Sequence, residues 1–396
     1  MAVRAPSRCV GLASLLALAL LPVGGCGGSS TKGGGSAGSA GSAGSAGTTG
    51  HGGGGGSGSA ATGGAAGTAG GGTGGSAGGA GATGGSGGAP GGRGGTGVAG
   101  ATGTGGGAGA ALQTVFVIVM SHEDWASIKG SSSAPYINQA LLAAGAHAEN
   151  YRTPPGNHPG EPNYIWMEAG SNLGITDDSE PSMNHQSTTD HLVSQLTAAG
   201  ISWRAYVEDI GGTTCPLVTS DLYVPRHVPF VFFDDITAAN SATSATCIEH
   251  VRPFTAFAAD LQQDQVARYN FIVPDLCDDM AGVSLSASCG GTAFPDLVKL
   301  GDDWLAANVP LILASAAQQR GGALFIVWDE GGGLLGASDG PIGMIALSPK
   351  AKPGYPSSIA YDHSSLLRTV ETIFGLPFLR GAQTAPDLGD LFTSFP

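Results

Sequence analysis

The sequence predicts an α/β fold for residues 112–396, with a mostly parallel sheet flanked by helices on both faces. Two apolar runs, 114–120 and 323–328, carry no charged residue. Such runs are typical of strands that are buried on both faces, as the strands of parallel sheets are. Segments with helical patterns alternate with these runs, which is the order that crossover helices require between parallel strands.

The other expected elements can be placed by the same patterns. Further strands are expected at 201–207, 269–273 and 341–347. A helix is expected at 134–144, and a second one is expected to end at about residue 169. Further helices are expected at 188–199, 253–263, 294–318 and 364–374. We expect Pro310 to interrupt the long helix at 294–318, because proline lacks an N–H and its ring clashes with the preceding turn.

Charge divides the chain at about residue 111. Residues 1–111 contain no Asp or Glu, and only four of the chain's 16 basic residues lie there. The remainder therefore carries 12 basic and 30 acidic residues, a net charge of −18. This acidity argues against a nucleic-acid partner, although a bound cation could still admit a phosphorylated ligand.

The amino-terminal segment has the pattern of an export signal. The apolar run 9–23 is too short to span a bilayer comfortably and ends in Val23-Gly24-Gly25-Cys26, which resembles a bacterial lipobox. Residues 1–25 are therefore expected to be a lipoprotein signal peptide and Cys26 the lipidated residue, which would anchor the chain to the cell envelope. An ordinary cleaved signal is the alternative. Residues 26–111 form a low-complexity Gly/Ala/Ser/Thr tether, and 112–396 form the folded domain.

A carboxylate pair follows the second apolar run directly. Asp329 and Glu330 come after Trp328 and precede three glycines. Because ligands bind beyond the carboxyl ends of strands in open α/β sheets, this pair suits a hard or borderline metal cation. A solvated turn is the alternative interpretation.

Four cysteines lie in the folded part, Cys215, Cys247, Cys277 and Cys289. An even number in an exported protein favours disulfides. Pairing by proximity gives Cys215–Cys247 and Cys277–Cys289, although two other connectivities remain open. A structural zinc site is less favoured because no C-x-x-C spacing is present.

Several motifs together carry a resemblance to a known family. The segments 133–138, 158–164, 226–230, 328–330, 348–352 and 361–368 occur in a characteristic order. In these segments, residues 115–379 resemble the phosphoesterase family of bacterial phospholipases C and acid phosphatases, within the alkaline-phosphatase-like superfamily. The resemblance implies an alkaline-phosphatase-like fold, a divalent metal cation of unknown identity and metal-assisted cleavage of phosphate esters.

The resemblance also exposes departures at the expected site. Ser121-His122 stand where the family has Glu-Asn, and Gly160 stands where the family has its serine nucleophile. Ala281 replaces a histidine after the retained Asp279. The resemblance therefore implies metal ligation by five residues: Asp329, Glu330, His363, Asp279 and His122.

Two histidines in matching segments could contact substrate. The resemblance places His158 and His227 near the phosphate, where each could equally be a hydrogen-bonded structural residue. The expected function is a phosphate ester hydrolase with weak or lost activity. A non-catalytic surface module that binds a phosphorylated or anionic ligand is the alternative. The expected partner is a phosphorylated small molecule or a phospholipid head group, and the oligomeric state is left open.

Overall fold

The computed structural model describes residues 111–282, 289, 295–332 and 336–396. All of these described residues belong to one compact unit, Gly97–Pro396. The expected signal peptide, the expected lipidation site Cys26 and almost all of the expected tether lie outside the described residues. Among the described residues, no helix has the combined length and apolar character needed to cross a bilayer.

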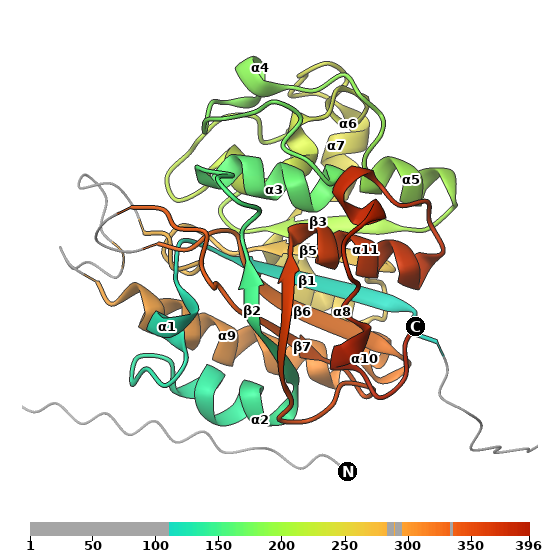
Figure 1. The fold of residues 1–396 in the computed structure, drawn as a ribbon. Coiled ribbons are helices and arrows are strands. Elements are labelled where there is room, and N and C mark those ends of the chain that lie inside the picture. The colour runs from blue at the N-terminus through green and yellow to red at the C-terminus, as the bar shows by residue number, and fades with distance from the viewer. Residues whose placement is uncertain (1–110, 283–288, 290–294, 333–335) are drawn as a thin grey trace, which may run out of the picture. The chain divides into compact units, whose positions relative to one another are not determined.

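One eight-stranded sheet forms the centre of the fold, in the order β4-β3-β5-β1-β6-β7-β2-β8 (Figure 1). Its strands are β1 (Thr114–Met120), β2 (Ala146–Arg152), β3 (Trp203–Val207), β4 (Val251–Pro253), β5 (Tyr269–Val273), β6 (Gly322–Trp328), β7 (Met344–Leu347) and β8 (Pro356–Asp362). Strands β5 and β6 are buried along their whole length, and β1 is buried except at Thr114, which confirms the interpretation of the apolar runs as strands covered on both faces.

The sheet is mostly parallel, as predicted. Strand β7 is the exception, because it runs antiparallel to both of its neighbours, β6 and β2. No helix lies between β6 and β7 among the described residues, so the chain returns without the crossover that a parallel pair requires.

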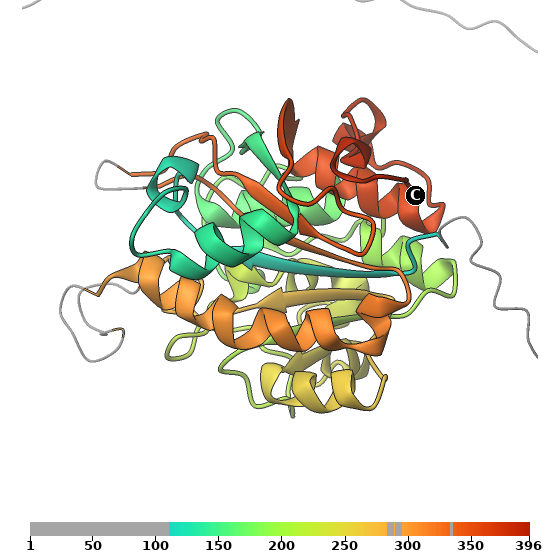
Figure 2. The same cartoon turned by 90° about the horizontal axis from the view of Figure 1, so that it is seen from below.

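Helices cover both faces of the sheet. The longer helices on one face are α3 (Gly160–Ala169), α5 (Leu192–Ala198) and α11 (His363–Phe374), and those on the other are α8 (Phe257–Gln262) and α9 (Leu297–Ala314) (Figures 1 and 2). The shorter helices are α1 (Trp125–Ile128), α2 (Leu142–Ala144), α4 (Pro181–Asn184), α6 (Asp234–Thr237), α7 (Ala245–His250) and α10 (Ala316–Gln319). A π-helical turn, η1 (Ile137–Leu141), leads into α2.

The prediction that Pro310 interrupts a helix is wrong. Helix α9 continues through Pro310 to Ala314. Leu305, Val309 and Ile312 are buried on either side of it, so packing against the sheet holds the helix together. Pro310 itself is exposed, on the side where a carbonyl that has lost its N–H partner can be hydrated.

Both predicted disulfides are present. Cys215 pairs with Cys247, and Cys277 pairs with Cys289. All four half-cystines are buried. Asp279, a residue of the candidate site, lies between the two half-cystines of the second bridge, two residues after Cys277.

Candidate active site

The site begins with two residues that the sheet places side by side. Strands β1 and β6 pair in parallel up to Met120 and Trp328, so the next residues, Ser121 and Asp329, leave the sheet together. The Asp329 N–H still donates to the Met120 carbonyl at 3.0 Å. The Ser121 hydroxyl donates to Asp329 Oδ2 at 3.1 Å. The sheet register therefore fixes this contact.

Asp329 is fully buried and receives several hydrogen bonds. Its Oδ1 accepts the N–H of His122 at 3.0 Å and that of Glu330 at 2.6 Å. Burial first, and then the neighbouring charge of Glu330, raise the pKa of Asp329 to about 8.

Glu330 lies between two histidines. Its Oε1 is 3.3 Å from His122 Nδ1, and its Oε2 is 2.6 Å from His158 Nδ1. The other nitrogen of His158 contacts Asp339 at 2.8 Å. The hydrogen bond to Glu330 raises the pKa of His122. Burial lowers the pKa of His158, but its hydrogen bonds to the two carboxylates outweigh this effect and the pKa is raised.

Gly160 begins helix α3 and faces Asp329. The loop before the helix is held by Asn163, whose side-chain amide donates to the carbonyls of Asn157 at 2.8 Å and Pro159 at 3.3 Å. A Cβ at position 160 would lie 3.0 Å from Asp329 Oδ2. The start of α3 is thus held directly against the buried carboxylate.

His227 and Asp279 form a second buried pair. His227 Nδ1 lies 2.9 Å from Asp279 Oδ2, but the geometry is not that of a hydrogen bond, and Oδ2 has no hydrogen-bond partner. The His227 ring stacks on Tyr164 with centroids 4.8 Å apart. Burial lowers the pKa of His227 well below its usual value and raises that of Asp279 well above it, so burial disfavours the charged form of each group.

His363 contacts the backbone carbonyl of Asp329. It is the first residue of α11 and is fully buried. Its Nε2 lies 2.6 Å from the Asp329 carbonyl, and its Nδ1 lies 3.2 Å from the Tyr151 hydroxyl. The carbonyl can only accept, so Nε2 carries the proton and Nδ1 accepts from Tyr151. Burial lowers the pKa of His363 to about 4, in keeping with a neutral ring.

These groups surround a cavity of about 390 Å³. Its lining residues are Ser121, His122, Pro159, Gly160, Asp178, Arg226, His227, Ala281, Gly282, Asp329, Glu330 and Ala337. Arg226 supplies the one guanidinium among them, and its Nε lies 3.7 Å from Asp178 Oδ2. Asp178 Oδ1 in turn accepts the N–H of Glu161 at the start of α3, at 2.9 Å.

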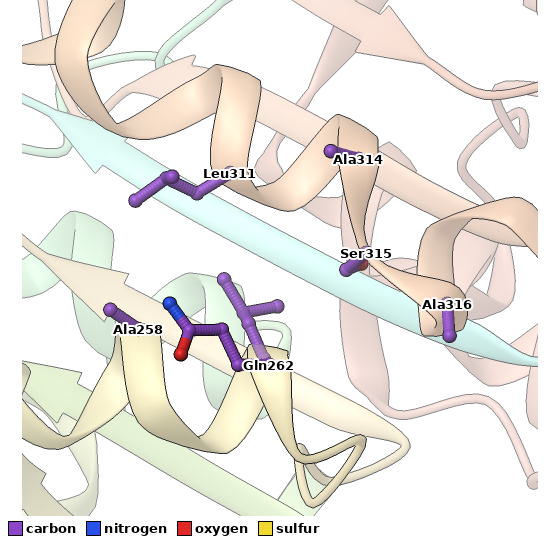
Figure 3. A pocket seen from close by; sticks show the side chains of 7 residues that line it. Ala258, Gln262, Leu311, Ala314, Ser315 and Ala316 are labelled. Atoms are coloured by element: carbon purple, nitrogen blue, oxygen red, sulfur yellow. The ribbon is translucent and has the colours of Figure 1, made fainter. Parts of the chain in front are cut away.

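A separate cavity of about 260 Å³ lies between α8 and α9 (Figure 3). It is lined by Ala258, Leu261, Gln262, Leu311, Ala314, Ser315 and Ala316. None of these side chains can exchange a proton near neutral pH. We therefore place the candidate chemistry in the cavity around Asp329.

Comparison with known proteins decides the family. A sequence profile of the Phosphoesterase family matches residues 132–377. The chain belongs to the Phosphoesterase family. The matched segment contains Gly160, Arg226, Asp329 and His363, so the family assignment covers most of the cavity described above.

Individual relatives include named phosphatases. The phosphatidylinositol-3-phosphatase of Mycobacterium tuberculosis (strain ATCC 25618 / H37Rv) is 27% identical over 279 residues, covering 70% of this chain and 82% of that protein. A probable acid phosphatase of Kluyveromyces lactis is 26% identical over 280 residues, covering 68% of this chain and 60% of that protein.

Solved structures show a looser likeness. An alkaline phosphatase superfamily protein from Vibrio parahaemolyticus aligns with a TM-score of 0.45 and 8% identity, over 73% of this chain and 74% of that one.

The carboxylates of this phosphoesterase fit a hard divalent cation, although among the described residues no three of the five predicted ligands bring their ligand atoms within 4.8 Å of one another. Asp329 and Glu330 both line the cavity, and one or two carboxylates suffice to hold a hydrated cation such as Mg²⁺ together with a phosphate. Asp279 offers a buried oxygen without a hydrogen-bond partner. The ring nitrogens of His363 are both engaged, and His122 Nδ1 faces Glu330. The structure thus supports a cation site formed by carboxylate oxygens.

Among the described residues, one group of three side chains brings potential ligand atoms within 4.8 Å of one another, and it lies elsewhere. It comprises Glu208, Asp275 and Asp278, beyond the ends of β3 and β5. Both oxygens of Glu208 already accept hydrogen bonds, from the Asp275 N–H and the Trp304 indole. None of the three lines the Asp329 cavity.

Sequence reasoning missed two residues of the site. Arg226 lies in a motif that carries the family resemblance, but the resemblance points to its neighbour His227 as a phosphate contact. Asp178 has the pattern of a turn or capping residue, and it does bond the N–H of Glu161 near the start of α3, yet it also lines the cavity beside Arg226. The guanidinium in a predicted phosphate site was the signal that could have identified Arg226.

Proposed function

We propose that this phosphoesterase hydrolyses phosphate esters in the Asp329 cavity, with low turnover. The observation that carries the proposal is the arrangement of Asp329, Glu330 and Arg226 around one cavity that the start of α3 closes. Acidic groups for a cation and a guanidinium for an anion are brought together there, as phosphoryl transfer requires.

Each group has a distinct part in this proposal. Arg226 binds the phosphate oxygens, because a guanidinium donates two parallel hydrogen bonds to such a group. A divalent cation held by Asp329 and Glu330 would supply positive charge that polarises the phosphoryl group. His363 positions Asp329 by donating to its backbone carbonyl. His158 and His122 orient Glu330 from its two sides.

Gly160 is the reason to expect low turnover. The family nucleophile position carries no side chain here, although the backbone stands beside Asp329. Loss of a nucleophile can lower kcat by on the order of a millionfold, with some catalysis remaining from the rest of the site. The substrate class we propose is a phosphorylated small molecule or a phospholipid head group, in line with the name of the mycobacterial relative.

The decisive experiment is a turnover assay on the full chain. Hydrolysis of p-nitrophenyl phosphate and of bis-p-nitrophenyl phosphate would be followed across a set of divalent metals. Asp329→Ala serves as the inactive control, since it removes the carboxylate at the centre of the cavity. We expect metal-dependent turnover that this substitution abolishes, and turnover equal to that of the control would overturn the proposal.

A binding module is the second candidate, and Gly160 is the observation that favours it. Such a protein would hold a phosphorylated ligand through Arg226 without cleaving it. Metal content does not separate the two functions, because a binding module could retain a cation. Saturable binding of inorganic phosphate with no turnover would identify the binding module. If the chain held no metal and bound no phosphate, an adhesive or structural role would be favoured.

We further propose that Cys26 anchors the protein to the bacterial cell envelope through lipid. The support is the sequence pattern alone, with buried disulfides as a hint of an oxidising compartment. Cell fractionation tests it, because Cys26→Ala is expected to move the protein from the membrane fraction to the soluble one.

A further inference from the structure

We infer that Ser121 supplies the hydroxyl nucleophile of this site, in place of the side chain that Gly160 lacks. The inference rests on the proposed function, since it names the attacking group of the same reaction. It concerns a residue that stands where the family has a glutamate, so it assigns a new role to this position.

Two positions converge on one oxygen atom. The Ser121 hydroxyl lies 3.1 Å from Asp329 Oδ2. A Cβ at position 160 would lie 3.0 Å from the same Oδ2. Ser121 arrives from the end of β1 and residue 160 from the start of α3. A hydroxyl on either residue therefore stands beside the same carboxylate, and only Ser121 has one.

The lining of the cavity leaves no competitor. Of the described residues that line it, Ser121 alone carries a hydroxyl group. Glu330, which also lines the cavity, is engaged by His122 and His158.

The backbone holds Ser121 in place. Its N–H donates to the Asp279 carbonyl at 2.7 Å, on the β5 side of the strand. On the β6 side, the register sets Ser121 against Asp329. The hydroxyl is therefore preorganised by the sheet and does not depend on a flexible loop, as a nucleophile should be.

The proposed step conserves atoms. The Ser121 Oγ forms a bond to phosphorus as the ester P–O bond breaks, and the hydroxyl proton ends on the departing alcohol. A water oxygen then forms a bond to phosphorus and the Oγ–P bond breaks. One water proton returns to Oγ, which releases inorganic phosphate. The pathway thus passes through a covalent phosphoserine.

Trapping this intermediate tests the inference. The full chain, loaded with the divalent metal that best supports turnover, would be mixed with p-nitrophenyl phosphate and quenched in acid. Peptide mass spectrometry would then locate any phosphoryl group. We expect phosphoserine at residue 121, and loss of both label and turnover to background in Ser121→Ala. Ser187→Ala, at an exposed loop position, is the matched control and should keep both.

Two further measurements guard against a purely structural role of Ser121. Ser121→Thr retains a hydroxyl and should carry the label as phosphothreonine, whereas a mere loss of packing would not move the label to a new residue type. Transfer of the phosphoryl group to added ethanol should compete with hydrolysis in the wild type, because a phosphoenzyme partitions between acceptors.

The outcomes separate this inference from the proposed function. Turnover that persists in Ser121→Ala, with no labelled residue in the wild type, overturns the inference and leaves hydrolysis by direct water attack. A label at residue 121 without steady turnover supports the inference, and it would mean that hydrolysis of the phosphoserine is the rate-limiting step. Neither label nor turnover in the wild type overturns both.

Discussion

Gly160 controls what can approach Asp329 from helix α3. Its missing side chain leaves the α3 side of the Asp329 carboxylate open, and any Cβ there would meet Oδ2 at 3.0 Å. The carboxylate would have to yield by a few tenths of an ångström. The cost of a small side chain at this position therefore depends on how far the Asp329 carboxylate can move, and an alanine variant measures that cost in a gain-of-function test.

We expect Gly160→Ser to raise the turnover of p-nitrophenyl phosphate by about tenfold or more, because a second positioned hydroxyl then stands beside Asp329. Gly160→Ala adds the same Cβ without the hydroxyl and should give no gain. Steady-state kinetics of the two variants against the wild type provide the measurement. Equal rates for the serine and alanine variants would refute the expectation.

Arg226 and Asp178 should act on anion binding with opposite signs. Asp178 Oδ2 lies 3.7 Å from the Arg226 guanidinium and therefore competes with an incoming phosphate for it. We expect Arg226→Gln to weaken inhibition by inorganic phosphate by about tenfold or more, since a charge-assisted hydrogen bond is lost. Asp178→Asn should strengthen it. The measurement is the inhibition constant of inorganic phosphate for each variant. Shifts in the same direction for both variants would contradict the prediction that Asp178 competes with phosphate for Arg226.

At the scale of elements, the N-terminus of α11 links the helix to the site. Asp362 caps α11, with its Oδ1 accepting the N–H groups of Ser364 at 2.9 Å and Ser365 at 3.2 Å. The next residue, His363, supports the Asp329 carbonyl. The cap therefore fixes both the start of a helix and the position of the carboxylate.

We expect Asp362→Ala to lower the free energy of unfolding by about 1 kcal/mol, which is typical for the loss of such a cap. Thermal unfolding followed by circular dichroism would show a decrease in Tm of about 2–4 °C. Asp303→Ala removes an exposed carboxylate that pairs with Lys299 within α9. That control should cost less than about 0.5 kcal/mol, so comparable losses in both variants would argue against a special role of the cap.

Strands that are buried on both faces could be predicted from the sequence, and strands with polar or exposed residues could not. The central strands β1 and β5 were predicted with the residue limits observed, because burial on both faces leaves an uninterrupted apolar run. Strands β2 and β8 were not predicted. Strand β2 includes His147 and Glu149, and β8 is an edge strand with mostly exposed or half-buried residues. Neither offers a continuous apolar signal.

The sequence predicted which site residues follow a strand, but it did not predict contacts between residues that are distant in the chain. The sequence placed Asp329 and Glu330 at the end of a buried strand, where they lie. It did not indicate that Ser121 stands beside Asp329, because that contact depends on β1 and β6 being neighbours in the sheet. It also did not indicate that both nitrogens of His363 are engaged, since the Tyr151 hydroxyl and the Asp329 carbonyl come from distant parts of the chain.

At the scale of the whole molecule, His191 lies at the start of α5 and contacts residues of α3 and α6. The residue is fully buried, with Nδ1 2.9 Å from Glu168 of α3 and Nε2 3.0 Å from Asp235 of α6. Ser194 of α5 also bonds Asp235. Burial alone would lower the pKa of His191, but the hydrogen bonds to Asp235 and Glu168 raise it to about 9. The ring is therefore charged at neutral pH.

This raised pKa predicts alkaline sensitivity. The stabilisation is fully present below the unfolded pKa of about 6.5 and is lost as the pH rises through about 9. We expect the difference in Tm between the wild type and His191→Gln to be large near pH 6 and to shrink by about pH 10. His185→Gln, at an exposed histidine beside Asp234, is the control substitution. A difference independent of pH would mean that packing, and not charge, explains the effect of His191.

The position of β1 has a kinetic consequence for synthesis. This strand is the first of the domain to be made, yet Val115 pairs with Tyr269 and Thr114 pairs with Gly322. The centre of the sheet therefore cannot close until the ribosome has passed β6, and nearly the whole domain waits without its central pairings. A topology of such high contact order folds slowly and exposes strand edges meanwhile. During biogenesis we expect the nascent chain to depend on holdase chaperones until β6 has been made and can pair with β1.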